Sequence, residues 1–95
     1  MFIVFLEFAE NKARAPELMQ EHNAWIRRGF DEGVFALVGS LESKRGGAIV
    51  AHGTSREALQ TRVESDPFVI AGVVSAQIIE LTPSRTDERL KFLAD

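Results

Sequence analysis

The chain contains no cysteine, so it has neither a disulfide framework nor a thiolate for chemistry. This composition fits a reducing compartment, and we expect the protein to be cytoplasmic. An excess of positive charge is also lacking, because the net charge is -3 and lysine and arginine are interspersed with aspartate and glutamate. Since nucleic-acid-binding domains carry a basic patch or stripe, we expect no nucleic-acid partner.

Long apolar runs are absent as well. Residues 2–8 (FIVFLEF) are apolar apart from Glu7, are too short to span a bilayer and lack the basic leader of a signal peptide. We therefore expect a strand there, and no membrane partner. With 95 residues, the chain is long enough for one domain with a modest core. We predict a single domain over residues 1–95.

The hydrophobic periodicity predicts one long helix and four strands. Apolar residues three and four apart predict a helix over residues 16–32, which Pro16 begins and Gly33 ends. β-branched and aromatic residues predict strands over residues 2–8, 34–41, 47–52 and 73–81. A polar turn over residues 42–46 joins the two middle strands as a hairpin.

A second helix is predicted to begin at Thr54, whose hydroxyl fits a capping box with Glu57 three residues on. The pair Asp66-Pro67 breaks this helix. After Pro83, residues 84–95 form a tail that can contain one or two helical turns.

The order strand, helix, strand, strand, helix, strand is that of the α+β, ferredoxin-like βαββαβ fold, an antiparallel four-stranded sheet with both helices on one face. Strands 2–8 and 34–41 are apolar on both faces. In the second of these, simple alternation assigns Val34, Ala36 and Val38 to one face and Phe35, Leu37 and Leu41 to the other. Because two helices cover only one face, we predict that a second subunit covers the other in a two-fold homodimer.

His22 is the best indication of chemistry. It is one of two histidines in the chain, and it falls on the apolar stripe of the helix over residues 16–32, where a leucine would pack. Asp66 is its predicted partner, because a carboxylate fixes the tautomer of an imidazole and supports its protonated form. Two alternatives stay open: His22 is a core residue with satisfied hydrogen bonds, and Asp66 only caps a turn that Pro67 begins.

Three further residues complete the predicted site. Trp25 and Phe68 are predicted to provide apolar walls for a planar substrate, and Ser40 to donate a hydrogen bond to one of its oxygens. For Trp25, a core position is the alternative. A metal site would have to combine His22, His52 and Asp66, whose spacing matches no metal-binding motif. We expect no metal and no cofactor.

Several short segments, in their order and spacing, resemble the YciI-like family, also called YCII-related domain proteins. They are residues 21–26 (EHNAWI), 39–40 (GS), 46–49 (GGAI), 54–58 (TSREA), 66–68 (DPF) and 71–73 (AGV). The resemblance covers nearly the whole chain except the tail over residues 84–95. At Ser40 the sequence departs from the family pattern, in which many relatives have a proline after the glycine.

The resemblance implies the dimeric α+β barrel fold and a pocket for a small molecule in which His22 and Asp66 form the active-site pair. The activities of the family are mostly unassigned, and acid–base elimination such as dehydrochlorination is among the chemistry linked to it. The first hypothesis is therefore a cofactor-independent lyase or isomerase for a cyclic or aromatic compound. It predicts a rate that follows an ionisation near neutrality and that His22→Ala abolishes.

Other classes of function compete with this hypothesis. A non-catalytic small-molecule-binding or accessory protein would use the same pocket without turnover. Within the enzyme class, a cofactor-free oxygenase is the runner-up. An RNA-recognition module, another common use of this topology, is disfavoured because the strand over residues 47–52 has no aromatic residue on which a base could stack.

Overall fold

The computed structural model describes residues 1–94, and the six predicted helices and strands are all present. The elements in chain order are β1 (Phe2–Phe8), η1 (Lys12–Arg14), α1 (Ala15–Asp31), β2 (Phe35–Ser40), η2 (Glu42–Lys44), β3 (Gly46–Ala51), α2 (Arg56–Glu64), α3 (Pro67–Ile70), β4 (Val74–Glu80) and η3 (Glu88–Ala94). The elements labelled η are short 3₁₀ segments. No helix within residues 1–94 has the length and apolar character needed to cross a bilayer.

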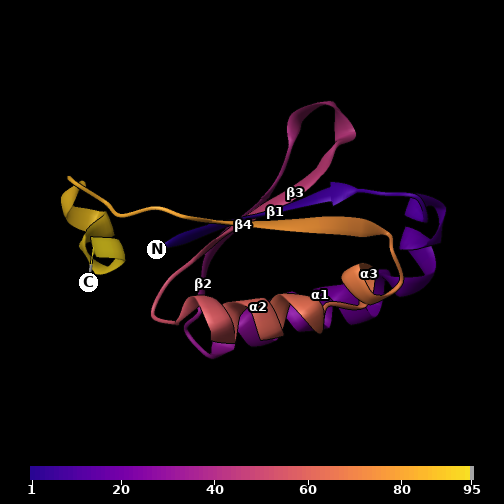
Figure 1. Cartoon of the computed structure of the whole chain (residues 1–95), viewed down its shortest axis with the longest axis horizontal. Helices are drawn as coiled ribbons and strands as arrows, with labels where there is room; N and C mark the ends of the chain where they lie inside the picture. The colour runs from indigo at the N-terminus through magenta and orange to yellow at the C-terminus, as the bar shows by residue number, and fades with distance from the viewer. Residues whose placement is uncertain (95) are drawn as a thin grey trace.

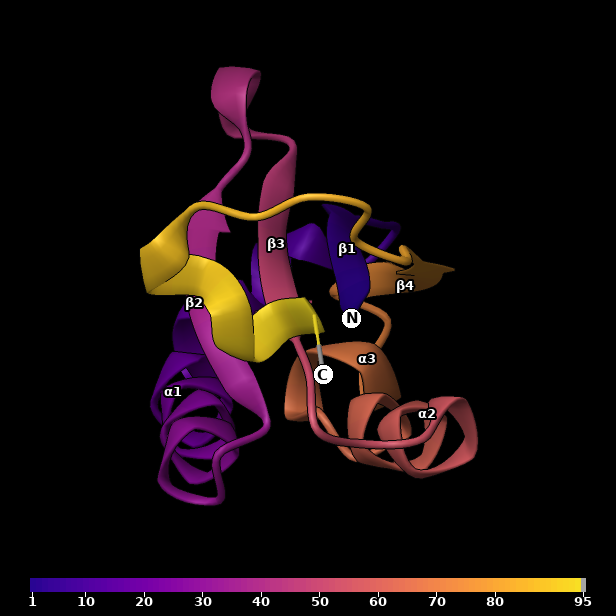
Figure 2. The ribbon, with the colours of Figure 1, turned by 90° about the vertical axis from the view of Figure 1, so that its left-hand side faces the viewer.

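The four strands form one antiparallel sheet in the order β2-β3-β1-β4. All three α-helices lie beneath this sheet in Figure 1, and its upper face carries none of them. Figure 2 shows the same two layers end on, with the four strands side by side above the helices. This arrangement confirms the predicted ferredoxin-like α+β fold.

Alternate residues of β1 build the core on the helix-facing side of the sheet. Phe2, Val4 and Leu6 are buried there. Their partners Ala51 and Ile49 on β3 are fully buried on the same side. The helices complete this layer with Trp25, Leu59, Val63 and Phe68.

The simple alternation predicted for the second strand is wrong at one point. The register between β2 and β3 shifts between Phe35 and Leu37, so that Phe35 pairs with Ala51 and Val38 pairs with Ile49. Because a bulge inserts one residue into the strand, Phe35 and Val38 lie on the same, helix-facing side of the sheet. Leu37 therefore lies on the opposite face from both.

The face of the sheet that the helices leave open is apolar over part of its area, and Glu7 and Gln77 lie on the same face. Ile3 pairs with Val50 on one side and Ile79 on the other, and Leu37 pairs with Val50 in turn. Leu37 is 56% exposed and Ile79 is 40% exposed. Apolar side chains from all four strands thus share one open face, which is unusual for a monomeric protein.

The second helix begins one residue later than predicted. Its N-cap is Ser55, whose side chain accepts a hydrogen bond from the amide of Ala58 at 3.0 Å. Thr54 does not cap the helix, because its hydroxyl donates to the carbonyl of Ser55 instead. The prediction of a Thr54 cap is therefore wrong, since a neighbouring serine competes for the same role.

The tail contains the predicted helical turn, η3. It lies beyond the end of the sheet near the N-terminus in Figure 1, and in front of β2 and β3 in Figure 2. The ring of Phe92 contacts the ring of His52 at a centroid distance of 5.0 Å. This places His52 beside the tail, at the end of β3.

Gly29 allows α1 to pack closely against the ring of Phe35 on β2. A methyl group there would overlap the ring of Phe35, which is buried edge-on against Trp25. We expect Gly29→Ala to lower the free energy of unfolding by about 1–3 kcal/mol despite the better helix propensity of alanine. Urea denaturation measures this change. Gly39→Ala is the control, because a methyl group at Gly39 meets open space, and equal losses in the two variants would contradict the close approach.

Candidate functional site

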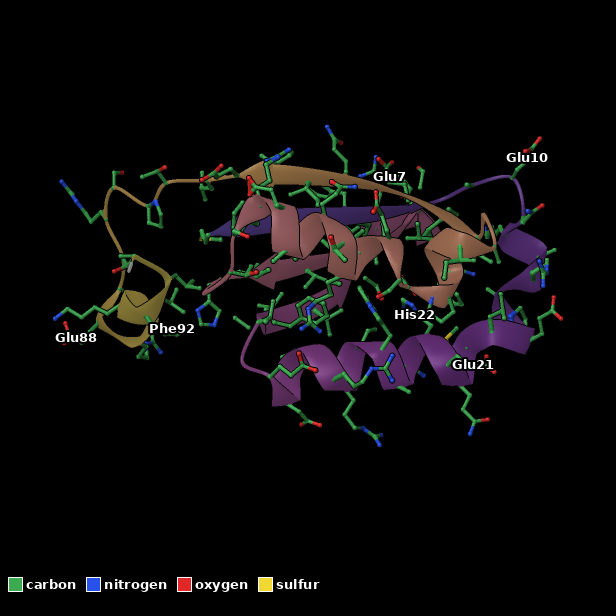
Figure 3. All side chains as sticks on the ribbon, turned by 60° about the horizontal axis from the view of Figure 1, so that its bottom comes forward. Glu7, Glu10, Glu21, His22, Glu88 and Phe92 are labelled. Atoms are coloured by element: carbon green, nitrogen blue, oxygen red, sulfur yellow. The ribbon has the colours of Figure 1, made fainter. Side chains whose placement is uncertain are left out.

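His22 and Asp66, which are 44 positions apart in the sequence, meet between α1 and α3. The Nδ1 atom of His22 lies 2.8 Å from the Oδ1 atom of Asp66. The histidine is 8% exposed and the aspartate is completely buried. In Figure 3, His22 lies in the space between α1 and the layer of α2 and α3. The structure thus brings together the two residues that the sequence predicted as partners.

Asp66 also caps α3, so the two roles considered for it coexist. Its Oδ1 atom accepts a second hydrogen bond, of 3.0 Å, from the amide of Phe68. Within residues 1–94, its Oδ2 atom has no hydrogen-bond partner. Because Oδ1 already accepts the amide of Phe68, we assign it as the acceptor of the contact with His22 too, with Nδ1 of His22 as the donor. The other ring nitrogen, Nε2, is therefore the one left for a ligand.

Two aromatic rings fix the plane of the imidazole. The ring of Phe68 stacks on His22 at a centroid distance of 3.9 Å and an angle of 3°. Trp25 lies 5.9 Å away at 22°. Together with the bond to Asp66, these contacts hold His22 in one orientation, which general acid–base chemistry requires.

A pocket of about 340 Å³ opens beside His22, between α1 and the strands. Its walls are mainly apolar, and the polar side chains in its lining are those of His22, Asn23 and Ser40. The full lining consists of Leu6, Phe8, Met19, His22, Asn23, Ile26, Val38, Gly39, Ser40, Gly46, Gly47, Ala48, Ile49, Phe68 and Val74. A volume of this size suits a single substituted ring.

Glycine at the base of the hairpin makes room for this pocket. Gly47 pairs with Leu6 on one side and Ser40 on the other, so a side chain there would point to the helix-facing side of the sheet. A Cβ atom at Gly47 would lie 3.0 Å from the carbonyl oxygen of Gly39. The strands are therefore tightly packed beneath the pocket, and the missing side chain leaves space above them.

The other predicted site residues divide into two groups. Phe68 and Ser40 line the pocket together with His22. Trp25 does not line it, because its indole is buried and donates to the carbonyl of Arg62 at 3.0 Å. It holds α1 against α2, which is the core position considered for it. Among residues 1–94, no group of three His, Cys, Asp or Glu side chains could hold a metal ion.

Asn23 lines the pocket and was not among the predicted site residues. It belongs to a row along α1 with Met19 and Ile26, three and four residues apart, and this row faces the pocket. His22 and Trp25 belong to the adjacent row, in which Trp25 is buried in the core and His22 reaches the edge of the pocket. A polar residue within an otherwise apolar row was the available signal.

Comparisons with known proteins agree with this architecture. The family model described as the YCII-related domain matches residues 1–82. Among solved structures, the chain is similar to 5-chloro-2-hydroxyhydroquinone dehydrochlorinase (TftG) from Burkholderia phenoliruptrix AC1100, in complex with 2,5-dihydroxybenzoquinone. The TM-score is 0.68 at 14% identity, over 85% of this chain and 93% of that chain. At this identity the likeness shows a shared fold alone. A comparison with curated proteins finds no match.

Comparison of two helix caps tests how much the hydrogen bond between Asp66 and His22 contributes to stability. Ser55 and Asp66 each accept a backbone hydrogen bond of 3.0 Å at the start of a helix. We expect Ser55→Ala to lower the free energy of unfolding by about 1 kcal/mol. Asp66→Ala should cost about 2–4 kcal/mol, because it also leaves His22 without its buried partner. Urea denaturation measures both, and equal costs would mean that the contact adds nothing to stability.

Proposed function

The chain belongs to the YCII-related domain family, and from this premise we propose that it is a lyase or isomerase that moves protons on a small cyclic substrate. His22 is the proposed general acid–base, and Asp66 orients it and stabilises its protonated form. The observation that carries the proposal is the contact of 2.8 Å between His22 and the buried Asp66, at the edge of a pocket the size of one ring. The cytoplasm remains the expected compartment.

The geometry suits transfer of a proton to and from Nε2 of His22. With Nδ1 held by Asp66, Nε2 accepts a proton from a bound ring compound, and the carboxylate stabilises the imidazolium that forms. A positioned general base of this kind typically contributes about 10²- to 10⁴-fold to a rate. Phe68, stacked on the imidazole, offers an apolar edge to a flat ring.

Dehydrochlorination of a hydroxylated aromatic compound is the form of this chemistry that we propose to test. Transfer of a proton from one ring hydroxyl, through Nε2 of His22, to the ring carbon that bears chlorine makes that carbon tetrahedral and the hydroxyl oxygen a carbonyl. Removal of a hydroxyl proton then expels chloride with the electron pair of the C–Cl bond and leaves a conjugated quinone, so the net loss is HCl. The name of the structurally similar dehydrochlorinase supports this choice of substrate class.

A non-catalytic binder of the same compounds is the second candidate. The apolar lining of the pocket, with only a few polar side chains, favours binding of a ring whether or not a reaction follows. Turnover separates the two candidates, because a binder releases its ligand unchanged.

The first test is release of chloride from 5-chloro-2-hydroxyhydroquinone. We expect the wild type to release chloride and His22→Gln to lower kcat by at least about 10²-fold without loss of fold. Asp66→Asn should lower kcat less and change its dependence on pH. Glu21→Gln, an exposed neighbour on α1, is the control and should leave the rate unchanged. A folded His22→Gln variant with the wild-type rate would disprove the role of His22, and binding without chloride release would support the non-catalytic binder.

We further propose that the active form is a homodimer in which the open faces of two sheets pack together. Ile3, Val50, Leu37 and Ile79 lie on that face, and exposed apolar surface is worth roughly 25 cal/mol for each Å² that is removed from water. A second copy of the same face is self-complementary under two-fold symmetry.

A pair of charge substitutions tests the dimer. Leu37→Glu places a charge on the open face, whereas Ile70→Glu places one on α3, where Ile70 is 71% exposed. We expect Leu37→Glu to raise the dissociation constant of the dimer at least about tenfold, because it buries an unpaired charge. Ile70→Glu should not change it. Sedimentation equilibrium measures the constant, and a wild type that is monomeric at high micromolar concentration would refute the proposed assembly.

A further inference from the structure

We propose that Asn23 is a specificity-determining residue, which together with Ser40 binds a neutral oxygen substituent of the ring in the pocket beside His22. The inference rests on the proposed function in one respect, namely that a ring compound occupies this pocket. It adds a second hydrogen-bonding position to that of His22, and the two positions together determine which ring compounds bind.

Polar groups in the pocket are few and unengaged. Among the described residues, the polar side chains in the lining besides His22 are those of Asn23 and Ser40. Both are exposed, and within residues 1–94 neither side chain takes part in a hydrogen bond. Polar groups placed singly in an apolar pocket are the ones that orient a ligand, because every other wall contact is non-directional.

The two side chains reach the pocket from different elements. Asn23 projects from α1 in the row that contains Met19 and Ile26. Ser40 ends β2 and pairs with Gly47, so that its side chain lies on the helix-facing side of the sheet. Asn23 on α1 and Ser40 on β2 line the same pocket, so an oxygen substituent of a ligand that lies between the helix and the strand can contact both.

The chemistry of the lining selects a neutral oxygen. The amide of Asn23 and the hydroxyl of Ser40 can each donate and accept a hydrogen bond, so they suit a hydroxyl or a carbonyl group. Within the part of the chain that the structure describes, no lysine or arginine is in the lining, and the chain has a net charge of -3. A carboxylate or phosphate beside Asn23 and Ser40 would lose its hydration there without a lysine or arginine to compensate, and the charge of a protonated His22 is already balanced by Asp66. The preferred ligand is thus a ring with one oxygen toward His22 and a second toward Asn23.

NMR titrations with simple phenols test this assignment. The probes are phenol, catechol, resorcinol and hydroquinone, and the signals are those of the His22 ring and of the single tryptophan, Trp25. We expect the best diol to bind the wild type about three- to tenfold more tightly than phenol, as one added neutral hydrogen bond allows. Asn23→Ala should remove this preference, because it should lower the affinity for the diol and leave the affinity for phenol unchanged.

A control variant on α1 and a second variant in the pocket complete this test. Gln20→Ala alters another exposed polar residue of α1 that does not line the pocket, and it should leave both affinities unchanged. Ser40→Ala should weaken the same diol, and the double variant should lose less than the sum of the two single losses, because both residues bind one oxygen.

The outcomes separate this inference from the proposed function. If the phenols bind near His22 but Asn23→Ala changes diol and phenol equally, or changes neither, the role of Asn23 is disproved and the proposed function stands. If no phenol shifts the His22 signals of the wild type, the pocket does not accept rings, and both are overturned.

Discussion

The hydrogen bond between His22 and Asp66 is the contact on which the organisation of the site depends. It links α1 to α3 across 44 positions of sequence, at 2.8 Å and almost out of reach of water. The same oxygen of Asp66 begins α3 by accepting the amide of Phe68, and that helix places the ring of Phe68 on the imidazole. One carboxylate therefore sets where α3 begins, which nitrogen of His22 is open, and how the ring is oriented. A helix cap has become part of a candidate active site, because a carboxylate oxygen has lone pairs for two donors.

Individual residues show how much of the fold and of the site could be predicted from the sequence. The 3.6-residue period of α1 and the apolar strands were sufficient for the fold, since burial of one face dominates the choice of secondary structure. The partnership of His22 with Asp66 was predictable from residue type and from family resemblance. The position of Trp25 was not, because the core-facing and pocket-facing rows of α1 are both apolar, and only packing against α2 shows which row Trp25 belongs to. The bulge before Leu37 was also hidden, since a strand that is apolar on both faces reads the same in either register.

The bulge in β2 determines which side chains of this strand lie on each face of the sheet. By inserting one residue into β2, it leaves Leu37 on the open face and turns Val38 toward the helices, where Val38 lines the pocket with Ser40. The strand that would contact a second subunit through Leu37 is thus the one that supplies part of the pocket wall on its other side.

The energetics of the buried pair bear on whether His22 is a core residue or a catalytic one. Asp66 is completely buried, and one of its two carboxylate oxygens has no partner within residues 1–94. Desolvating such a group is costly, and apolar residues of similar volume at both positions would often be as stable or more stable. A buried histidine needs an acceptor for its Nδ1 proton in either role. In the proposed function the carboxylate has a further use, because it would stabilise the imidazolium that forms where little water reaches. Under the proposed function the pocket beside the ring gives that arrangement a use, and the cost in stability would be the expected consequence of holding a proton-transferring group in a fixed orientation.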